Sequence, residues 1–153
     1  RASQYIRVFR GDALERQIAE KGLDWFFEHS FARHLPAGSV SAEDRAAYLD
    51  EWNQPGALTA MFNWYRASPT DVPDMDALVE VTAFLQRPFP QVIVPTLVIW
   101  GVNDPALLPC QLAGLDTLVR DLTIRKIDAG HFSPWEAPEA VTQAMREWLG
   151  VAR

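Results

Sequence analysis

Two short segments constrain this chain more than any other feature, because each carries a chemically useful side chain just after a strand-like run. They are Trp100-Gly101-Val102-Asn103-Asp104 and Asp128-Ala129-Gly130-His131. The stretch between them is long enough for one helix and one strand. In an open α/β sheet, the loops that follow parallel strands gather at one edge, where ligands bind. The spacing therefore predicts that Asp104 and His131 lie on two neighbouring loops.

The second part of the chain alternates strand and helix patterns. Val92 to Trp100 is an almost wholly apolar run, which is typical of a strand buried on both faces of a parallel sheet. Cys110 to Val119 suits a helix, Leu122 to Ile127 alternates as an edge-like strand does, and Pro138 to Gly150 is amphipathic at helical spacing. This order predicts an α/β fold with parallel pairing and a right-handed crossover. Two strands make a poor sheet alone, so we expect further strands elsewhere.

The first part of the chain is patterned as helices. Apolar side chains at helical spacing predict a helix from Ala13 to Phe31, interrupted at Gly22, and another from Gly56 to Ala67. Ser41 has the features of an N-cap for a helix between these two. A further helical pattern runs from Asp76 to Gln86.

A cluster of three prolines, Pro88, Pro90 and Pro95, divides the two kinds of pattern. We therefore expect a helical region over residues 1–90. A β-α-β-α segment should follow over residues 91–153.

Charge and composition argue against several classes of partner. The 153 residues carry a net charge of −6 without a run of Lys or Arg, so we expect binding neither to nucleic acid nor to a membrane. The single cysteine, Cys110, has no partner for an internal disulfide. The first residues, Arg1-Ala2-Ser3-Gln4, contain neither Met nor a signal-peptide core, so we expect a cytoplasmic protein with a truncated N-terminus. We expect neither a metal nor a cofactor.

A carboxylate beside a histidine is the acid–base part of a catalytic triad. Asp104 would accept a hydrogen bond from one nitrogen of His131, fix its tautomer and leave the other nitrogen to act as a base. Each residue also has a simpler interpretation. Asp104 lies in an Asn-Asp-Pro sequence typical of turns and caps, and His131 could be a surface loop residue. Their joint position and chain order favour the catalytic interpretation.

The segment from Val94 to Trp148 closely resembles the C-terminal segment of the α/β-hydrolase superfamily. The resemblance implies that residues 1–90 form a helical lid, or cap, and that residues 91–153 form the last β-α-β-α part of the core. It also implies the triad order nucleophile, acid, histidine, in which Asp104 and His131 are catalytic. The matching residues are Pro95-Thr96-Leu97-Val98-Ile99-Trp100-Gly101, Asp104, Asp128-Ala129-Gly130-His131 and Glu136-Ala137-Pro138.

Two segments of the first region resemble the lid of epoxide hydrolases in particular. Asn63-Trp64-Tyr65-Arg66 resembles the motif whose tyrosine points at the substrate, and Tyr5, four residues before Phe9, resembles the second lid tyrosine. The resemblance implies that both tyrosines are catalytic and donate a hydrogen bond, then a proton, to the epoxide oxygen as the ring opens. An alternative is that Tyr65 is a core aromatic residue. The expected pocket, for a small apolar substrate, is lined by Phe62, Trp64, Phe132 and Trp135.

One part that such an enzyme needs is missing from the sequence. It contains no Gly-x-Ser-x-Gly or Gly-x-Asp-x-Gly segment that could form a nucleophile elbow. We therefore expect a C-terminal part, inactive by itself, of an enzyme that converts an epoxide to a diol through an alkyl-enzyme ester. Its expected partner is the missing N-terminal half or a second copy in a homodimer. Two alternatives stay open: a carboxylic ester, lactone or halo-acid hydrolase, and a non-catalytic fragment that forms a dimeric module.

Overall fold

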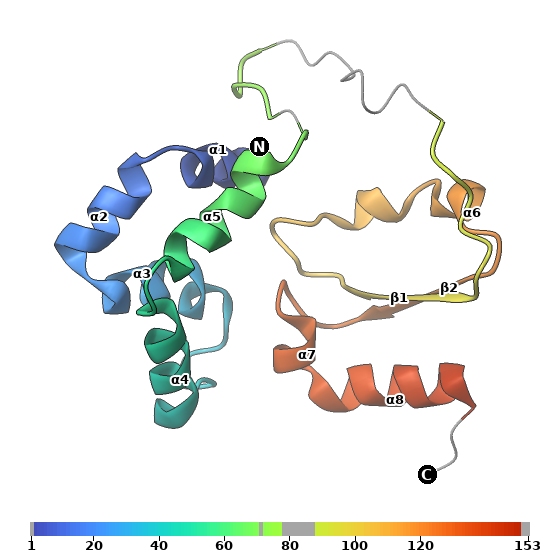
Figure 1. Ribbon diagram of the computed structural model, residues 1–153. Helices are drawn as coiled ribbons and strands as arrows, with labels where there is room; N and C mark the ends of the chain where they lie inside the picture. The colour runs from blue at the N-terminus through green and yellow to red at the C-terminus, as the bar shows by residue number, and fades with distance from the viewer. Residues whose placement is uncertain (1, 71, 78–87, 151–153) are drawn as a thin grey trace. The chain divides into compact units, whose positions relative to one another are not determined.

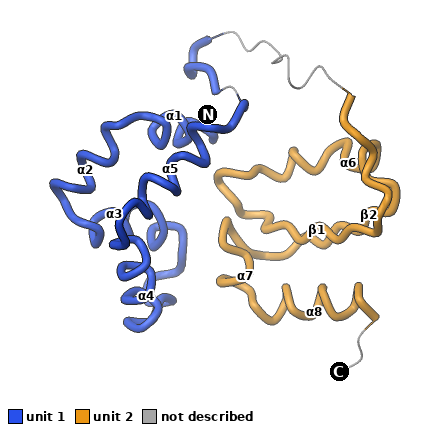
Figure 2. Tube along the Cα trace, in the orientation of Figure 1, with its two compact units in different colours: residues 1–87 blue, residues 88–153 orange. Residues whose placement is uncertain are grey.

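The computed structural model describes residues 2–70, 72–77 and 88–150. The chain divides into two compact units, residues 1–87 and residues 88–153, which Figure 2 shows in different colours. Unit 1 is helical, whereas unit 2 holds a pair of strands with helices (Figure 1).

Unit 1 consists of short helices joined by tight turns. The helical stretch expected from Ala13 to Phe31 is two helices, because Gly22 adopts a φ of 91°, a value that glycine reaches without a Cβ clash. The α-helices are α1 (Tyr5–Arg10), α2 (Ala13–Lys21), α3 (Leu23–Ser30), α4 (Ala42–Trp52) and α5 (Ala57–Ala67), and 3-10 turns lie at Ala2–Gln4 and Ala32–His34.

The N-terminus of α4 is capped as the sequence predicts. The hydroxyl of Ser41 accepts a hydrogen bond from the amide of Asp44 at 3.0 Å. This bond satisfies one of the amides that the first turn of a helix leaves unpaired. The further helix expected over Asp76–Gln86 falls mostly on residues 78–87, which lie outside the described residues.

The core of unit 1 is rich in aromatic side chains. The ring of Phe62 is 2% exposed, and the ring of Phe9 lies 5.5 Å from it, measured between centroids. Burying a side chain of this size stabilises the fold by about 2–3 kcal/mol. These contacts hold α1 against α5. The buried cluster comprises Leu14, Ile18, Phe26 and Phe62.

Unit 2 is built on two parallel strands, β1 (Thr96–Gly101) and β2 (Leu122–Ile127), paired in register from Thr96↔Leu122 to Gly101↔Ile127. Among the described residues these strands form a two-stranded sheet. Helix α8 (Pro138–Leu149) contacts both strands, and the short α6 (Leu115–Leu118) lies on the opposite side of the pair in Figure 1. The predicted α/β arrangement with parallel pairing is therefore confirmed.

Strand β1 differs from its prediction in length and burial. The strand expected from Val92 begins at Thr96, and Val92 forms only an isolated bridge with Val119. Pro95 lies between them and has no N–H to donate to a ladder. Residues 96–100 are half-buried rather than buried on both faces. Within the described sheet the side chains of β1 have those of a neighbouring strand on one flank only, so they stay partly accessible.

The helix predicted over Cys110–Val119 is interrupted. It is replaced by a 3-10 turn at Pro109–Leu112 and by α6, and Gly114 separates the two with a φ of 82°. The last predicted helix is confirmed as α8, which follows the short α7 (Ser133–Glu136). In the described parts of both units, no helix is long and apolar enough to cross a membrane.

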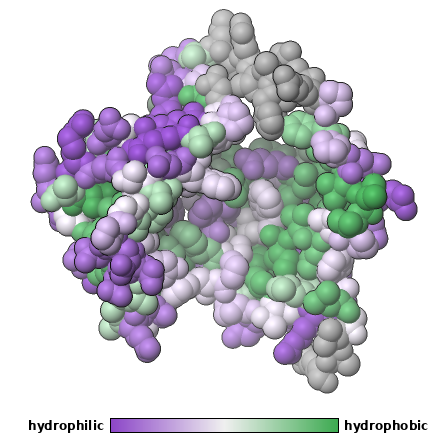
Figure 3. Space-filling view, viewed as in Figure 1, coloured by the Kyte–Doolittle hydropathy of each residue, from purple (hydrophilic) through white to green (hydrophobic). Residues whose placement is uncertain are grey.

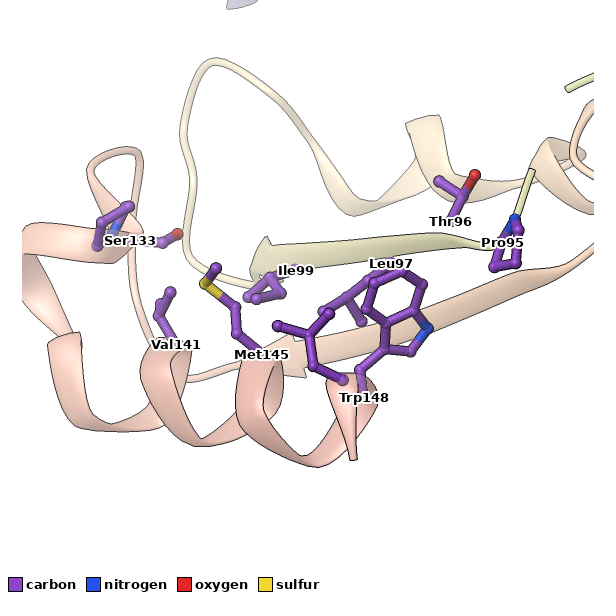
Figure 4. A pocket seen from close by; sticks show the side chains of 10 residues that line it. Pro95, Thr96, Leu97, Ile99, Ser133, Val141, Met145 and Trp148 are labelled. Carbon is purple, nitrogen blue, oxygen red and sulfur yellow. The ribbon is translucent and has the colours of Figure 1, made fainter. Parts of the chain in front are cut away.

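An apolar groove of about 570 Å³ lies between β1 and α8. Leu97 and Ile99 of β1 point toward Val141, Met145 and Trp148 of α8 (Figure 4). Figure 3 shows apolar side chains gathered over unit 2 on the face viewed there.

Candidate active site

The loops that follow β1 and β2 run beside each other because backbone hydrogen bonds join them. The amide of Val102 donates to the carbonyl of Ile127, and the amide of Asn103 donates to the carbonyl of Ala129, both at 3.0 Å. These bonds continue the strand pairing beyond the end of the sheet. The next polar side chains along the two loops are thereby brought to the same edge of unit 2.

The close approach of the two loops depends on Gly101, the last residue of β1. A Cβ at this position would lie 2.6 Å from the carbonyl oxygen of Ala129, 2.8 Å from the hydroxyl of Ser133 and nearer still to the carbonyl oxygen of Gly130. Real Cβ atoms essentially never lie below 3.0 Å from such atoms. Glycine is therefore required here because there is no room for a Cβ, and not because of a positive φ.

Asp104 is 7% exposed, and its two carboxylate oxygens have separate tasks. Oδ1 accepts hydrogen bonds from the amides of Ala106 and Leu107 at 2.8 Å and 2.9 Å, as a turn-forming aspartate does. Oδ2 lies 2.9 Å from Nδ1 of His131. The turn and the acid–histidine contact, which the sequence offered as alternatives, thus occur together on one residue.

The surroundings of Asp104 lower its pKa. Burial raises the pKa, but hydrogen bonds from the Leu107 amide, His131 and the Ala106 amide, together with the charge of His131, outweigh burial. The carboxylate is therefore ionised at neutral pH and accepts the Nδ1 proton. A neutral imidazole that donates through Nδ1 carries its acceptor at Nε2, the tautomer that a general base needs. The side chain of His131 is 31% exposed, so the pair opens toward its histidine.

A carboxylate holds the loop that carries His131. Oε2 of Glu136 accepts the amide of Gly130 at 2.8 Å, and Oε1 accepts the amide of Phe132 at 3.0 Å. The hydroxyl of Ser133 also donates to the carbonyl of Gly130 at 3.0 Å. In the sequence Glu136 stands out only as part of the Glu-x-Pro match, and this contact was not predicted. An acidic residue five positions after a histidine is too common a pattern to reveal it.

The two tyrosines singled out from the sequence lie together in unit 1. Tyr5 of α1 and Tyr65 of α5 pack edge to face, with ring centroids 6.0 Å apart. Arg10 fastens α1 to α5 by donating from Nε to the carbonyl of Tyr65 at 2.9 Å. Burial, and then the negative charge of an ionised Tyr5, raise the pKa of Tyr65. Its phenol is thus protonated at neutral pH and can act as a donor.

The four residues expected to line a pocket have different surroundings. In unit 1, Phe62 is 2% exposed and belongs to the buried cluster, and Trp64 is 78% exposed. In unit 2, the ring of Phe132 lies 5.0 Å from that of His131, and Trp135 of α7 is half-buried. None of the four lines the groove between β1 and α8. A pocket role for Phe62, Trp64, Phe132 and Trp135 stays a prediction.

A nearby serine and a possible metal site are the two further features to consider beside this pair. Ser133 is close to His131 in sequence, but its hydroxyl is engaged with the Gly130 carbonyl and it begins α7 rather than standing on a strand–turn–helix elbow. No group of three or more His, Cys, Asp or Glu side chains among the described residues could hold a metal ion. Unit 2 thus holds a hydrogen-bonded aspartate and histidine, and unit 1 holds two phenols in contact with each other.

Comparisons with known proteins agree with the fold of the chain. The chain is 30% identical to the AB hydrolase superfamily protein YfhM of Bacillus subtilis (strain 168) over 149 residues, which are 96% of this chain and 48% of that protein. A solved epoxide hydrolase of the α/β-hydrolase superfamily, from metagenomes of hot environments, is 43% identical, with a TM-score of 0.82 over 97% of this chain and 50% of that one. An epoxide hydrolase from Bacillus megaterium, solved with an inhibitor, is 24% identical with a TM-score of 0.76 over 97% of this chain and 51% of that one. No family model matches the chain.

Fold and matches together place the chain in the α/β-hydrolase superfamily. It has the architecture of part of such an enzyme: helices followed by two parallel strands with their helices. The chain spans about half the length of the relatives that it matches.

Proposed function

We propose that this chain supplies the lid tyrosines and the acid–histidine pair of an epoxide hydrolase. The contact that carries the proposal is the 2.9 Å hydrogen bond between Nδ1 of His131 and Oδ2 of Asp104, on adjoining strand-end loops. The edge-to-face pair of Tyr5 and Tyr65 supports epoxides as the substrate class, because phenols can protonate a developing alkoxide. The 43% identity to a solved epoxide hydrolase supports it too.

The reaction proceeds in two steps. In the first, a carboxylate nucleophile attacks an epoxide carbon and breaks the C–O bond, while Tyr65 or Tyr5 gives its proton to the departing oxygen. In the second, Nε2 of His131 takes a proton from water, which attacks the carbonyl carbon of the ester. The ester collapses to a carboxyl group and an alkoxide, and the alkoxide takes the proton of the imidazolium, which Asp104 had stabilised, to give the diol. The carboxyl group then loses its proton, which restores the phenol that was deprotonated in the first step. The sequence lacks a nucleophile elbow, so the carboxylate comes from a segment outside these 153 residues.

A hybrid protein tests this function directly. The chain replaces the matched half of the 43% identical epoxide hydrolase, whose other half supplies the nucleophile. We expect the hybrid to convert an aryl glycidyl ether to its diol and the 153-residue chain alone to leave the epoxide unchanged. An aryl ester assayed in parallel distinguishes the ester-hydrolase alternative.

The His131→Gln variant of the hybrid should form the ester and fail to hydrolyse it. Intact-mass measurement should then show a protein heavier by one substrate molecule. The matched control is His29→Gln, which changes an exposed histidine of α3 and should leave turnover intact. Undiminished diol formation by His131→Gln would overturn the proposal.

A further inference from the structure

Glu136 makes two hydrogen bonds, one to each of the residues that flank His131 in the sequence. Its oxygens accept one amide each, from Gly130 just before the histidine and from Phe132 just after it, at 2.8 Å and 3.0 Å. Both bonds go to the main chain. They therefore fix the backbone at His131, irrespective of the conformation of the imidazole side chain. Hydrogen bonds to an ionised carboxylate are stronger than those between neutral groups.

The position of this carboxylate is set by close packing. A Cβ at Gly130 would lie 2.9 Å from Oε1 and 3.0 Å from Oε2 of Glu136, so the loop approaches the carboxylate as closely as glycine permits. The hydroxyl of Ser133 holds the same loop through the Gly130 carbonyl. On its other side the loop adjoins Gly101 of β1, where there is no room for a Cβ. The loop is thus held between a strand end and a carboxylate.

We propose that Glu136 is a positioning residue for His131, which acts by fixing the main chain on both sides of the histidine. This inference rests on the function proposed above, because it deepens the role of the same pair. The hydrogen bond from His131 to Asp104 is 2.9 Å long, and a loop free to move by 1 Å cannot keep it. Misplacement on that scale costs a catalytic group about 100-fold in rate.

The first test uses the 153-residue chain and needs no substrate. In the unchanged chain, hydrogen exchange should be slow at the amides of Gly130 and Phe132. NMR of the imidazole nitrogens should show the Nδ1 proton of His131 held in a hydrogen bond. In Glu136→Gln, whose amide keeps one acceptor and places a donor against the other N–H, we expect exchange at one of these amides to rise at least about 10-fold and the Nδ1 proton signal to broaden or vanish. Glu139→Gln, an exposed position in the first turn of α8, makes the same charge change and should alter neither.

The second test separates positioning from loss of stability. In the hybrid enzyme, Glu136→Gln should slow hydrolysis of the ester by about 10-fold to 100-fold and leave its formation, which does not use His131, unchanged. A merely structural defect would depress both steps together. Glu136→Asp keeps the charge but is one methylene shorter, so we expect an intermediate loss.

Two results would overturn the inference: fast exchange at Gly130 and Phe132 in the unchanged chain, or ester hydrolysis at the unchanged rate in Glu136→Gln. The first needs no variant, so it decides the matter even if Glu136→Gln fails to fold. If the hybrid shows no epoxide turnover but the Nδ1 signal of His131 still depends on Glu136, the proposed function is wrong and the positioning role is supported.

Discussion

Substituting Gly101 by alanine tests whether the acid–histidine contact depends on the distance between two backbones. The new Cβ would lie 2.6 Å from the carbonyl oxygen of Ala129 and nearer still to that of Gly130, whereas ordinary van der Waals contact begins at 3.4 Å, so one loop must move by at least about 0.8 Å. A displacement of that size would stretch the 2.9 Å bond between His131 and Asp104 to about 3.7 Å, beyond hydrogen-bond length. Overpacking of this kind costs about 1–3 kcal/mol.

Two measurements on the 153-residue chain check this reasoning. Thermal unfolding of Gly101→Ala should show a Tm lower by roughly 4–8 °C for a loss of about 2 kcal/mol, and the Nδ1 proton signal of His131 should be lost. The control is Gly114→Ala, where a Cβ meets nothing within 4 Å but the φ of 82° is strained for alanine. It should cost about 1 kcal/mol and keep the His131 signal. A Gly101→Ala chain that retains both its Tm and that signal would refute the argument from close approach.

Three further predictions concern other parts of the chain. The pKa of Asp104 is lowered in the folded state, so its ionised carboxylate stabilises the fold at a pH above the unfolded-state pKa of about 3.9. This stabilisation is lost as the pH falls through the pKa of the folded state. The stability of Asp104→Asn should therefore depend less steeply on pH in that window, which acid unfolding measures. The pKa of Tyr65, read from its ultraviolet titration, should fall toward the ordinary value in Tyr5→Phe, since one of the two causes of its rise is removed. Phe62→Ala should lower the free energy of unfolding by about 3–5 kcal/mol in urea titrations, whereas Trp64→Ala, at a position 78% exposed, should change it by less than about 0.5 kcal/mol.

Hydrophobic periodicity and local signals were sufficient to predict the helices and strands whose boundaries are set by adjacent residues. The Ser41 cap, the break at Gly22 and the whole of β2 follow from a few adjacent residues. The start of β1 does not, because an apolar run shows where a strand can form and not where a partner strand pairs with it. Residues 92–95 have strand-like composition, yet the ladder with β2 begins at Thr96. The helix predicted across Gly114 failed for a related reason, since a glycine that is tolerated in a helical pattern can instead end it in the left-handed region.

For the site, chain order and strand-end position predicted that Asp104 and His131 would be neighbours. In the structure, Oδ2 of Asp104 lies 2.9 Å from Nδ1 of His131. The supporting contacts could not be foreseen in the same way. The steric need at Gly101 and the two amides on Glu136 arise from the packing of separate loops, which no local pattern encodes. The catalytic roles of the pair and of the tyrosines stay predictions until turnover is measured.

Asp104 contacts both the turn after β1 and the imidazole of His131, so the acid of this site is hard to relocate. One oxygen shapes the turn after β1 while the other orients the imidazole, so the same carboxyl group defines the local chain path and the chemistry. An engineer who moved the acid to another strand would have to rebuild that turn from different residues. Exchange for glutamate would shift both contacts at once, because a longer side chain cannot keep its two oxygens at both places.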